Sequence, residues 1–156
     1  MAMEINVIID GDFAECPEAN WLQSVAERVL IAQGVSSNAE LGLVITSQKR
    51  VRELNRSYRG EDRPTDVLAF YMTSAGDAFV SPPDGVLHLG EVIISYPQAV
   101  LQAKERQHSL KKEIAILIIH GVLHLLGYDH EEPEPERQMR VREAETLNSI
   151  KEETSF

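Results

Sequence analysis

Three histidines in the C-terminal half of the sequence are the clearest candidates for chemistry. His120 and His124 are four residues apart, so on a helix both side chains would lie on the same face. Gly127 is suited to ending that helix, and the chain after it can return His130 to the same point. Three imidazoles that converge in this way suit a tetrahedral Zn²⁺ whose fourth position is open to water. The spacing therefore predicts a zinc site made of His120, His124 and His130.

A histidine on an apolar helix can also be a core residue whose ring nitrogens are satisfied by neighbouring groups. Here two of the three follow the apolar run Ile114–Ile119. Burying three imidazoles there without a metal would leave up to six ring nitrogens in need of partners, each unpaired one costing about 1–3 kcal/mol. No cysteine lies nearby, and histidine ligands without cysteine are typical of a catalytic rather than a closed structural site.

The histidine spacing matches the His-Glu-x-x-His-x-x-Gly-x-x-His arrangement of certain zinc peptidases, with one departure. Gly121 stands where such a peptidase has its glutamate general base. Losing a general base lowers the rate roughly 10²–10⁴-fold, so ordinary peptidase action is not expected. Met139 lies in a charged amphipathic segment and is interpreted as a packing residue, not as a methionine turn. A phosphodiester substrate depends less on a glutamate at position 121 and would favour an arginine partner that binds phosphate.

Length and composition favour one globular domain, residues 1–156, with a substantial core. The chain has 156 residues, of which 43% are hydrophobic. Its single cysteine, Cys16, cannot form an internal disulfide, so the fold does not require an oxidising compartment. We find no signal segment and no apolar run long enough to span a membrane. These features predict a soluble, cytoplasmic protein.

The charge is unevenly distributed along the chain. The net charge is −10, which disfavours indiscriminate binding to a polyanion. Residues 49–63 nevertheless carry six bases against three acids, whereas residues 1–20 carry five acids and no base. One basic segment in an acidic protein fits local phosphate recognition. A solvated helix face with ion pairs would have the same composition, so both interpretations stay open.

Apolar periodicity and turn residues predict four strands and five helices. The strands are expected at Glu4–Ile9, Ala39–Thr46, Val67–Tyr71 and His88–Ser95. The helices are expected at about 18–33, 48–56, 97–106, 110–126 and 136–151. A loop from Asn55 to Asp66 and a Gly- and Pro-rich loop at 73–87 separate these elements, and residues 131–135 form an acidic linker to the last helix. The β-branched run Ile114–Ile119 could be a strand by propensity, but its uninterrupted context and the histidine pair favour a buried helix.

The histidine segment resembles the signature of a known family. The run His120-Gly-x-Leu-His124-Leu-x-Gly127-Tyr128-Asp129-His130 is similar to that of the bacterial YbeY-like ribosomal-RNA maturation endoribonucleases. The similarity extends over about residues 41–147 and includes Asn55-x-x-Tyr58-Arg59, Pro64-Thr65-Asp66-Val67-Leu68-x-Phe70, Leu89-Gly90-x-Val92-x-Ile94-Ser95 and His108-Ser109. The chain departs at Ala69, where the family often has Ser, and at Glu91, where it usually has Asp.

The resemblance implies a zinc-dependent, single-strand-directed endoribonuclease that matures ribosomal RNA, notably the 3′ end of the small-subunit RNA, and acts in ribosome quality control. It implies an α+β, zincin-like fold in which a small mixed four-stranded sheet packs against a buried ligand helix, with other helices around it. His120, His124 and His130 carry over as Zn²⁺ ligands, and Arg59 as a functional basic residue. The implied partners are single-stranded ribosomal RNA and the small ribosomal subunit, with no membrane and no DNA.

The residues and the resemblance together predict a mechanism. We expect the zinc to bind a water or a phosphate oxygen and Arg59 to contact the backbone phosphate, although Arg59 could instead pair with Glu61 or Asp62. Asp129 could orient a ligand imidazole or cap the helix end. The other bases expected to steer RNA are Lys49, Arg50, Arg52, Arg56 and Arg63.

Several alternatives stay open. His88 and His108 are not expected to be ligands, and Tyr58 could stack on a base or pack in the core. A zinc hydrolase of another class, acting on a peptide or small molecule, would be favoured by a carboxylate such as Glu91 near the metal. A non-enzymatic ribosome-associated factor with structural zinc is the other possibility.

Overall fold

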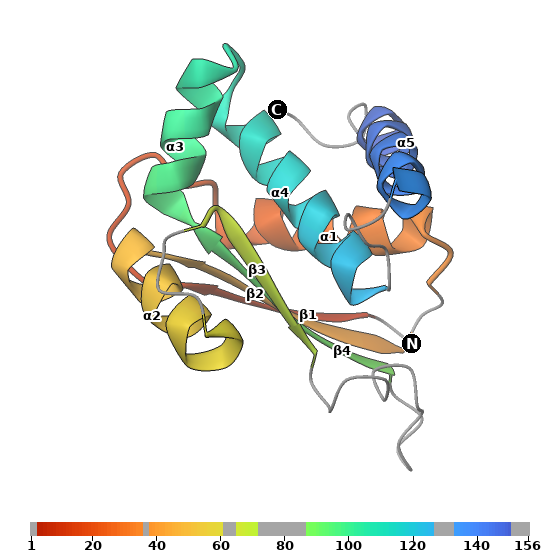
Figure 1. Cartoon of the computed structure of the whole chain (residues 1–156), viewed down its shortest axis with the longest axis horizontal. Coiled ribbons are helices and arrows are strands. Elements are labelled where there is room, and N and C mark those ends of the chain that lie inside the picture. The colour runs from red at the N-terminus through yellow and green to blue at the C-terminus, as the bar shows by residue number, and fades with distance from the viewer. Residues whose placement is uncertain (1–2, 36–37, 61–64, 72–86, 127–132, 151–156) are drawn as a thin grey trace.

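Four strands and five helices make up the described part of the chain (Figure 1). The computed structural model describes residues 3–35, 38–60, 65–71, 87–126 and 133–150. The elements in chain order are β1 (Glu4–Ile9), α1 (Ala19–Ala32), β2 (Ala39–Thr46), α2 (Gln48–Arg59), β3 (Val67–Tyr71), β4 (Leu87–Ser95), α3 (Tyr96–Glu105), α4 (Leu110–Leu125) and α5 (Pro133–Ile150). None of the helices within these residues is both long and apolar enough to cross a membrane.

The strands form one mixed sheet in the order β1-β2-β4-β3. Strands β1, β2 and β4 are parallel, and β3 pairs with β4 in the antiparallel direction. Parallel neighbours require a crossover connection, which explains why α1 separates β1 from β2 in the chain. The α+β fold with a small mixed four-stranded sheet is therefore confirmed.

Helices cover the two faces of this sheet unequally (Figure 1). On one face, Leu41, Leu43 and Ile45 of β2 are fully buried in a large core with residues of α1 and α4. On the other face, α2 packs Val51 against strand residues such as Leu68 and Ile93 in a smaller cluster. Each fully buried aliphatic side chain contributes about 1.5–3 kcal/mol. The larger core therefore fixes α4, the predicted ligand helix, against the sheet.

Helix α4 is buried on most of its surface, as predicted. Ten of its 16 residues are buried. Ser109 begins the helix, because its side-chain oxygen accepts a hydrogen bond from the backbone N–H of Lys112. The β-branched run Ile114–Ile119 is helical, since burial between the sheet and neighbouring helices outweighs a propensity cost of a few tenths of a kcal/mol per residue.

Helix α2 is longer than predicted. It ends at Arg59 and not at Arg56, so part of the predicted loop from Asn55 belongs to the helix. Gly60 ends it with a left-handed φ of 73°, and its N–H donates to carbonyls of the preceding turn. The polar run after Leu54 gave no apolar periodicity, and the prediction therefore stopped too early.

The start of the last helix also differs from the prediction, again by three residues. Helix α5 begins at Pro133, inside the predicted linker 131–135. Proline is tolerated in a first helical turn, because the N–H groups there have no acceptor within the helix. The predicted loop 73–87 lies outside the described residues except for Leu87, the first residue of β4. The single-domain division was not tested and stays a prediction.

Candidate metal centre

His120 and His124 lie on one face near the end of α4, as their spacing predicted. Their ring centroids are 4.8 Å apart, and the ring planes meet at 61° in an edge-on arrangement. Both side chains are partly exposed, whereas Leu123 and Leu125 beside them are buried. The pair therefore lies where an otherwise buried helix is partly exposed.

The described residues fit part of a zinc centre. Two imidazoles at i and i+4 on a helix are a ligand pair that zinc enzymes use. The expected third ligand, His130, lies outside the described residues, as do Gly127 and Asp129. Within the part of the chain that the structure describes, no group of three or more His, Cys, Asp or Glu side chains is arranged to hold a metal ion. The three-histidine site therefore stays a prediction.

The presence of glycine at position 121 is explained by tertiary packing, which the sequence did not reveal. A Cβ at this position would lie 2.6 Å from Cγ1 and 2.9 Å from Cγ2 of Val92 on β4. Val92 is fully buried, so it has little room to move. Helix and strand thus approach too closely for a side chain at 121. The glutamate that a peptidase would need here is excluded by the contact between α4 and β4.

Glu91 does not replace that missing base. Successive strand residues point to opposite faces of a sheet, and Val92 faces α4. Glu91 therefore points to the opposite face, where its Cγ lies 3.0 Å from the position of a Cβ on Gly42. Another class of zinc hydrolase would have been favoured by Glu91 lying near the histidine pair. Glu91 does not lie there.

A carboxylate that the sequence analysis did not select lies beside the histidine pair. Oε1 of Glu143, on α5, is 3.4 Å from Nδ1 of His120, and both side chains are about a quarter exposed, at 23% and 27%. No local spacing rule connects these two residues, since they lie on different helices. The only available signal was that α5 carries acidic residues soon after the histidine motif.

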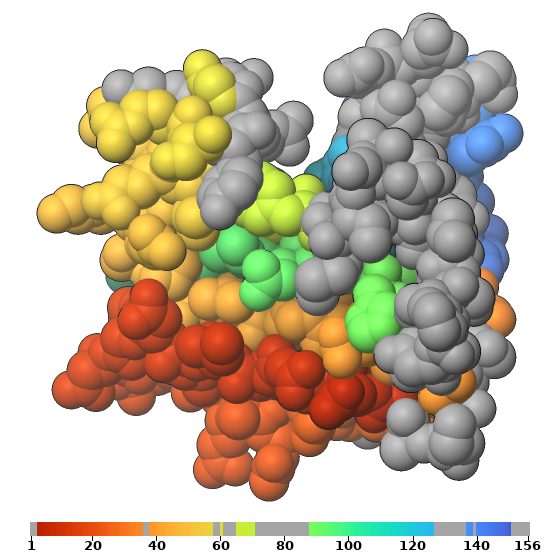
Figure 2. Space-filling view, turned by 90° about the horizontal axis from the view of Figure 1, so that it is seen from below, coloured from red at the N-terminus to blue at the C-terminus, as the bar shows by residue number. Residues whose placement is uncertain are grey.

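The basic segment lies mainly on α2, on the opposite face of the sheet from α4. Lys49, Arg50, Arg52 and Arg56 are exposed there, and Arg50 forms an ion pair of 3.6 Å with Glu53. Figure 2 shows α2 projecting from the sheet beside an uncovered part of β1, β2 and β4. Arg59 is the last residue of α2, and the structure describes its backbone only. The predicted contact of Arg59 with a phosphate near the metal is therefore untested.

The remaining two histidines each have a carboxylate partner. Nδ1 of His88 is 3.0 Å from Oε1 of Glu40. Nε2 of His108 is 2.6 Å from Oε1 of Glu113, whose side chain has no solvent exposure. Local hydrogen bonding at the junction between α3 and α4 was the expectation for His108, and it is confirmed.

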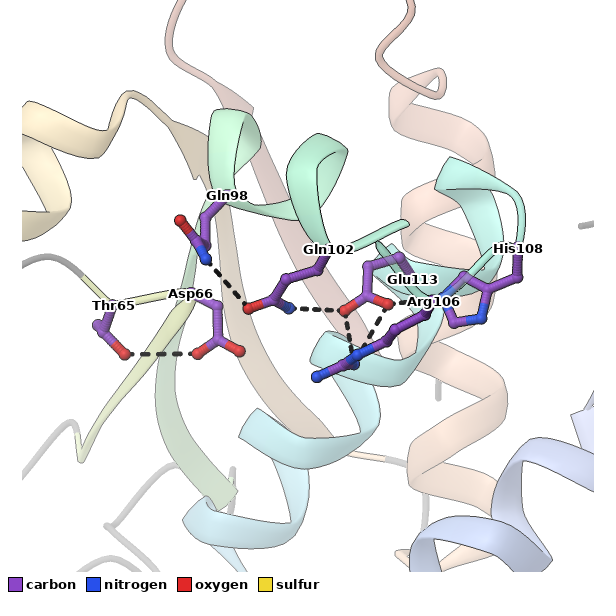
Figure 3. A network of polar contacts seen from close by, with 7 residues as sticks. All are labelled: Thr65, Asp66, Gln98, Gln102, Arg106, His108 and Glu113. Carbon is purple, nitrogen blue, oxygen red and sulfur yellow. Dashed lines mark hydrogen bonds and ion pairs between the residues drawn. The ribbon is translucent and has the colours of Figure 1, made fainter. Parts of the chain in front are cut away.

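Glu113 is the centre of a polar network at the start of α4 (Figure 3). Arg106 donates to its two carboxylate oxygens at 3.0 and 3.3 Å, and Gln102 donates at 2.8 Å. Gln98 extends the network along α3 by donating to Gln102 at 3.3 Å. A buried carboxylate requires such partners, because an unpaired charge in the interior is costly. The network therefore fixes the N-terminal end of α4 to α3.

The fold and the site define a small α+β domain whose buried helix presents a histidine pair next to a carboxylate from another helix. The model of the family described as Endoribonuclease YbeY matches residues 10–151. A relative named Endoribonuclease YbeY from Dehalococcoides mccartyi is 50% identical, with 96% of this chain and 91% of the relative covered. One from Roseiflexus sp. is 40% identical, with 94% and 92% covered. The chain therefore belongs to the YbeY family.

A solved structure agrees with this assignment. The solution structure of TM1509 from Thermotoga maritima has a TM-score of 0.64 and 26% sequence identity, and it covers 96% of this chain and 90% of that one. The family resemblance read from the histidine motif and its upstream segments is confirmed by these comparisons.

Proposed function

We propose that this protein is a zinc-dependent endoribonuclease that cleaves single-stranded RNA in the maturation of ribosomal RNA, including the 3′ end of the small-subunit RNA, and in ribosome quality control. Endoribonuclease activity follows from membership of the family, whose curated relatives carry that name. The observation that supports the zinc part is the His120–His124 pair on one face of α4. The protein would work in the cytoplasm with the small ribosomal subunit as its partner.

In this proposal His120, His124 and His130 hold one zinc ion. When bound, zinc supplies Lewis-acid polarisation of the scissile phosphodiester and activation of the nucleophile. The close packing of Gly121 on Val92 excludes a carboxylate base from the position that peptidases use. Electrostatic stabilisation of the phosphoryl group by the chain's own cations therefore has to contribute more.

The cation proposed for this task is Arg59, the last residue of α2. We propose that Arg59 binds a backbone phosphate, for which its planar guanidinium offers two parallel donors. The exposed bases Lys49, Arg50, Arg52 and Arg56 would attract the RNA without reading its sequence. The net charge of −10 over the whole chain would limit binding elsewhere on the surface.

Metal analysis combined with an RNA cleavage assay tests the proposal. Wild type should contain one zinc ion per chain and cleave single-stranded RNA. His124→Ala should lose both zinc and cleavage, whereas Arg59→Glu should keep zinc and lose cleavage. Lys104→Glu, a charge reversal at an exposed base on α3, is the matched control and should cleave normally. Full cleavage by His124→Ala would overturn the zinc proposal, and full cleavage by Arg59→Glu would overturn the role of Arg59.

A further inference from the structure

We infer that Glu143 is a positioning residue that orients the imidazole of His120 for metal binding. The inference rests on the proposed zinc site. Its first observation is the contact of 3.4 Å between Oε1 of Glu143 and Nδ1 of His120. Glu143 lies outside the histidine motif, on α5, and that helix thereby contributes to the site as well as to the core.

The chemistry of imidazole explains why such a contact matters. A neutral ring carries a proton on one nitrogen and a lone pair on the other, and the partner of one nitrogen decides which is which. A carboxylate near Nδ1 of His120 favours a proton there and leaves the lone pair on Nε2. The separation of 3.4 Å is longer than a typical hydrogen bond, and the contact is an ion pair only when the ring is protonated. Carboxylates in this position orient metal-binding histidines and raise their basicity.

Glu143 is held in place by the attachment of α5 to α1. Arg142 donates from Nε to Oε1 of Gln33 at 2.6 Å, and from Nη2 to the carbonyl of the last residue of α1 at 3.2 Å. Gln33 in turn donates to Oγ1 of Thr146 at 2.6 Å. Ile150, which is 2% exposed, anchors the end of α5 in the core. These contacts lie on both sides of Glu143 in the sequence, so its backbone position is fixed independently of His120.

The surroundings of Glu143 strengthen its electrostatic effect on His120. A hollow of about 230 Å³ between α4 and α5 is lined by Ile116, Ile119, Arg140, Glu143, Ala144 and Leu147. Four of these six side chains are apolar, the fifth is the cation Arg140, and Oε1 of Glu143 is itself buried. A charge removed from water interacts more strongly with its neighbours. A charge on Glu143 therefore acts on the nearby ring more strongly than the same charge would in open solvent.

Zinc affinity, measured by competition with a chromophoric chelator, tests the inference without relying on RNA cleavage. Glu143→Ala should bind zinc about 10–100-fold more weakly than wild type, as is typical when the partner of a ligand histidine is removed. Glu143→Gln keeps an oxygen that can accept from Nδ1 and should recover part of the loss. Glu145→Ala removes another carboxylate of α5, one that is 61% exposed and pairs with Arg142, and should bind zinc like wild type.

A spectroscopic readout separates positioning from a purely structural effect. In the zinc-free protein, the ¹⁵N chemical shifts of the His120 ring should report the proton on Nδ1, and this preference should disappear in Glu143→Ala. Zinc affinity in Glu143→Ala equal to that of Glu145→Ala, or an unchanged proton position, would overturn the inference. If Glu143→Ala does not fold, Glu143→Gln removes the charge at nearly constant volume and should still bind zinc more weakly than Glu145→Ala; equal affinities would then overturn the inference. A wild type that binds zinc but cleaves no RNA would refute the proposed function and leave this test intact.

Discussion

Replacing Gly121 by alanine tests whether the contact between α4 and β4 determines the residue at this position. Alanine is favoured over glycine in a helix by about 1 kcal/mol. Its Cβ, however, would lie 2.6 Å from Cγ1 of Val92, whereas ordinary contacts begin at 3.4 Å. Overpacking of this kind costs about 1–3 kcal/mol, and Val92 is a fully buried β-branched residue with little freedom. The overpacking cost less the gain in helix propensity leaves an expected loss of up to about 2 kcal/mol in the free energy of unfolding of Gly121→Ala.

Urea unfolding of the zinc-free protein measures this change without a contribution from metal binding. Val92→Ala supplies the control, because removing both Cγ atoms makes room for a Cβ at 121. The double variant should therefore be more stable than the sum of the two single changes predicts, with a coupling of about 1–2 kcal/mol. The reasoning is refuted if Gly121→Ala is more stable than wild type, or if the two changes are additive.

Three further predictions concern other parts of the molecule. Glu113→Gln should lower the free energy of unfolding by about 2 kcal/mol, because the buried carboxylate loses charge-assisted bonds to Arg106 and His108. Thermal unfolding would measure this loss, and an unchanged midpoint would count against the network. Removing zinc with a chelator should abolish cleavage and leave the circular dichroism spectrum nearly unchanged, because apolar packing fixes α4. Loss of the helical signal would instead favour structural zinc. Arg56→Gln should reduce the steepness of a plot of log affinity for single-stranded RNA against log salt concentration by about 0.7. The control Lys104→Gln, at an exposed base on α3, should not change it. The same steepness in both variants would exclude Arg56 from the RNA-binding surface.

Features that depend on local spacing were predictable from the sequence. The strands β1, β2 and β3 have the predicted bounds, because alternation and β-branched residues mark them clearly. The shared face of His120 and His124 follows directly from helical geometry, and the structure agrees. The family resemblance implied a mixed sheet, but neither the direction of β3 nor the order of the strands could be read from the sequence.

Features that depend on contacts between distant segments were missed. The prediction ended α2 early because the run from Asn55 to Arg59 is polar, yet Asn55 is only 2% exposed against the rest of the molecule. Glu143 was not selected because it approaches His120 through the packing of α5 on α4. Gly121 was recognised as the absence of a base, but its cause, the proximity of Val92, is a tertiary contact. Such contacts become visible only when the helices are placed on the sheet.

The ligand helix is held at three points, and these should have separable effects. Glu113 fixes its start to α3, whereas at two adjacent positions nearer its end Gly121 packs on β4 and His120 contacts Glu143. Glu113 and His120 are seven residues apart in α4, which corresponds to about 10 Å along the helix. A change at Glu113 should therefore lower stability and leave zinc affinity unchanged, because it does not touch a ligand ring. A change at Glu143 should lower zinc affinity and leave stability nearly unchanged. That side chain is partly exposed and acts mainly on the orientation of one imidazole.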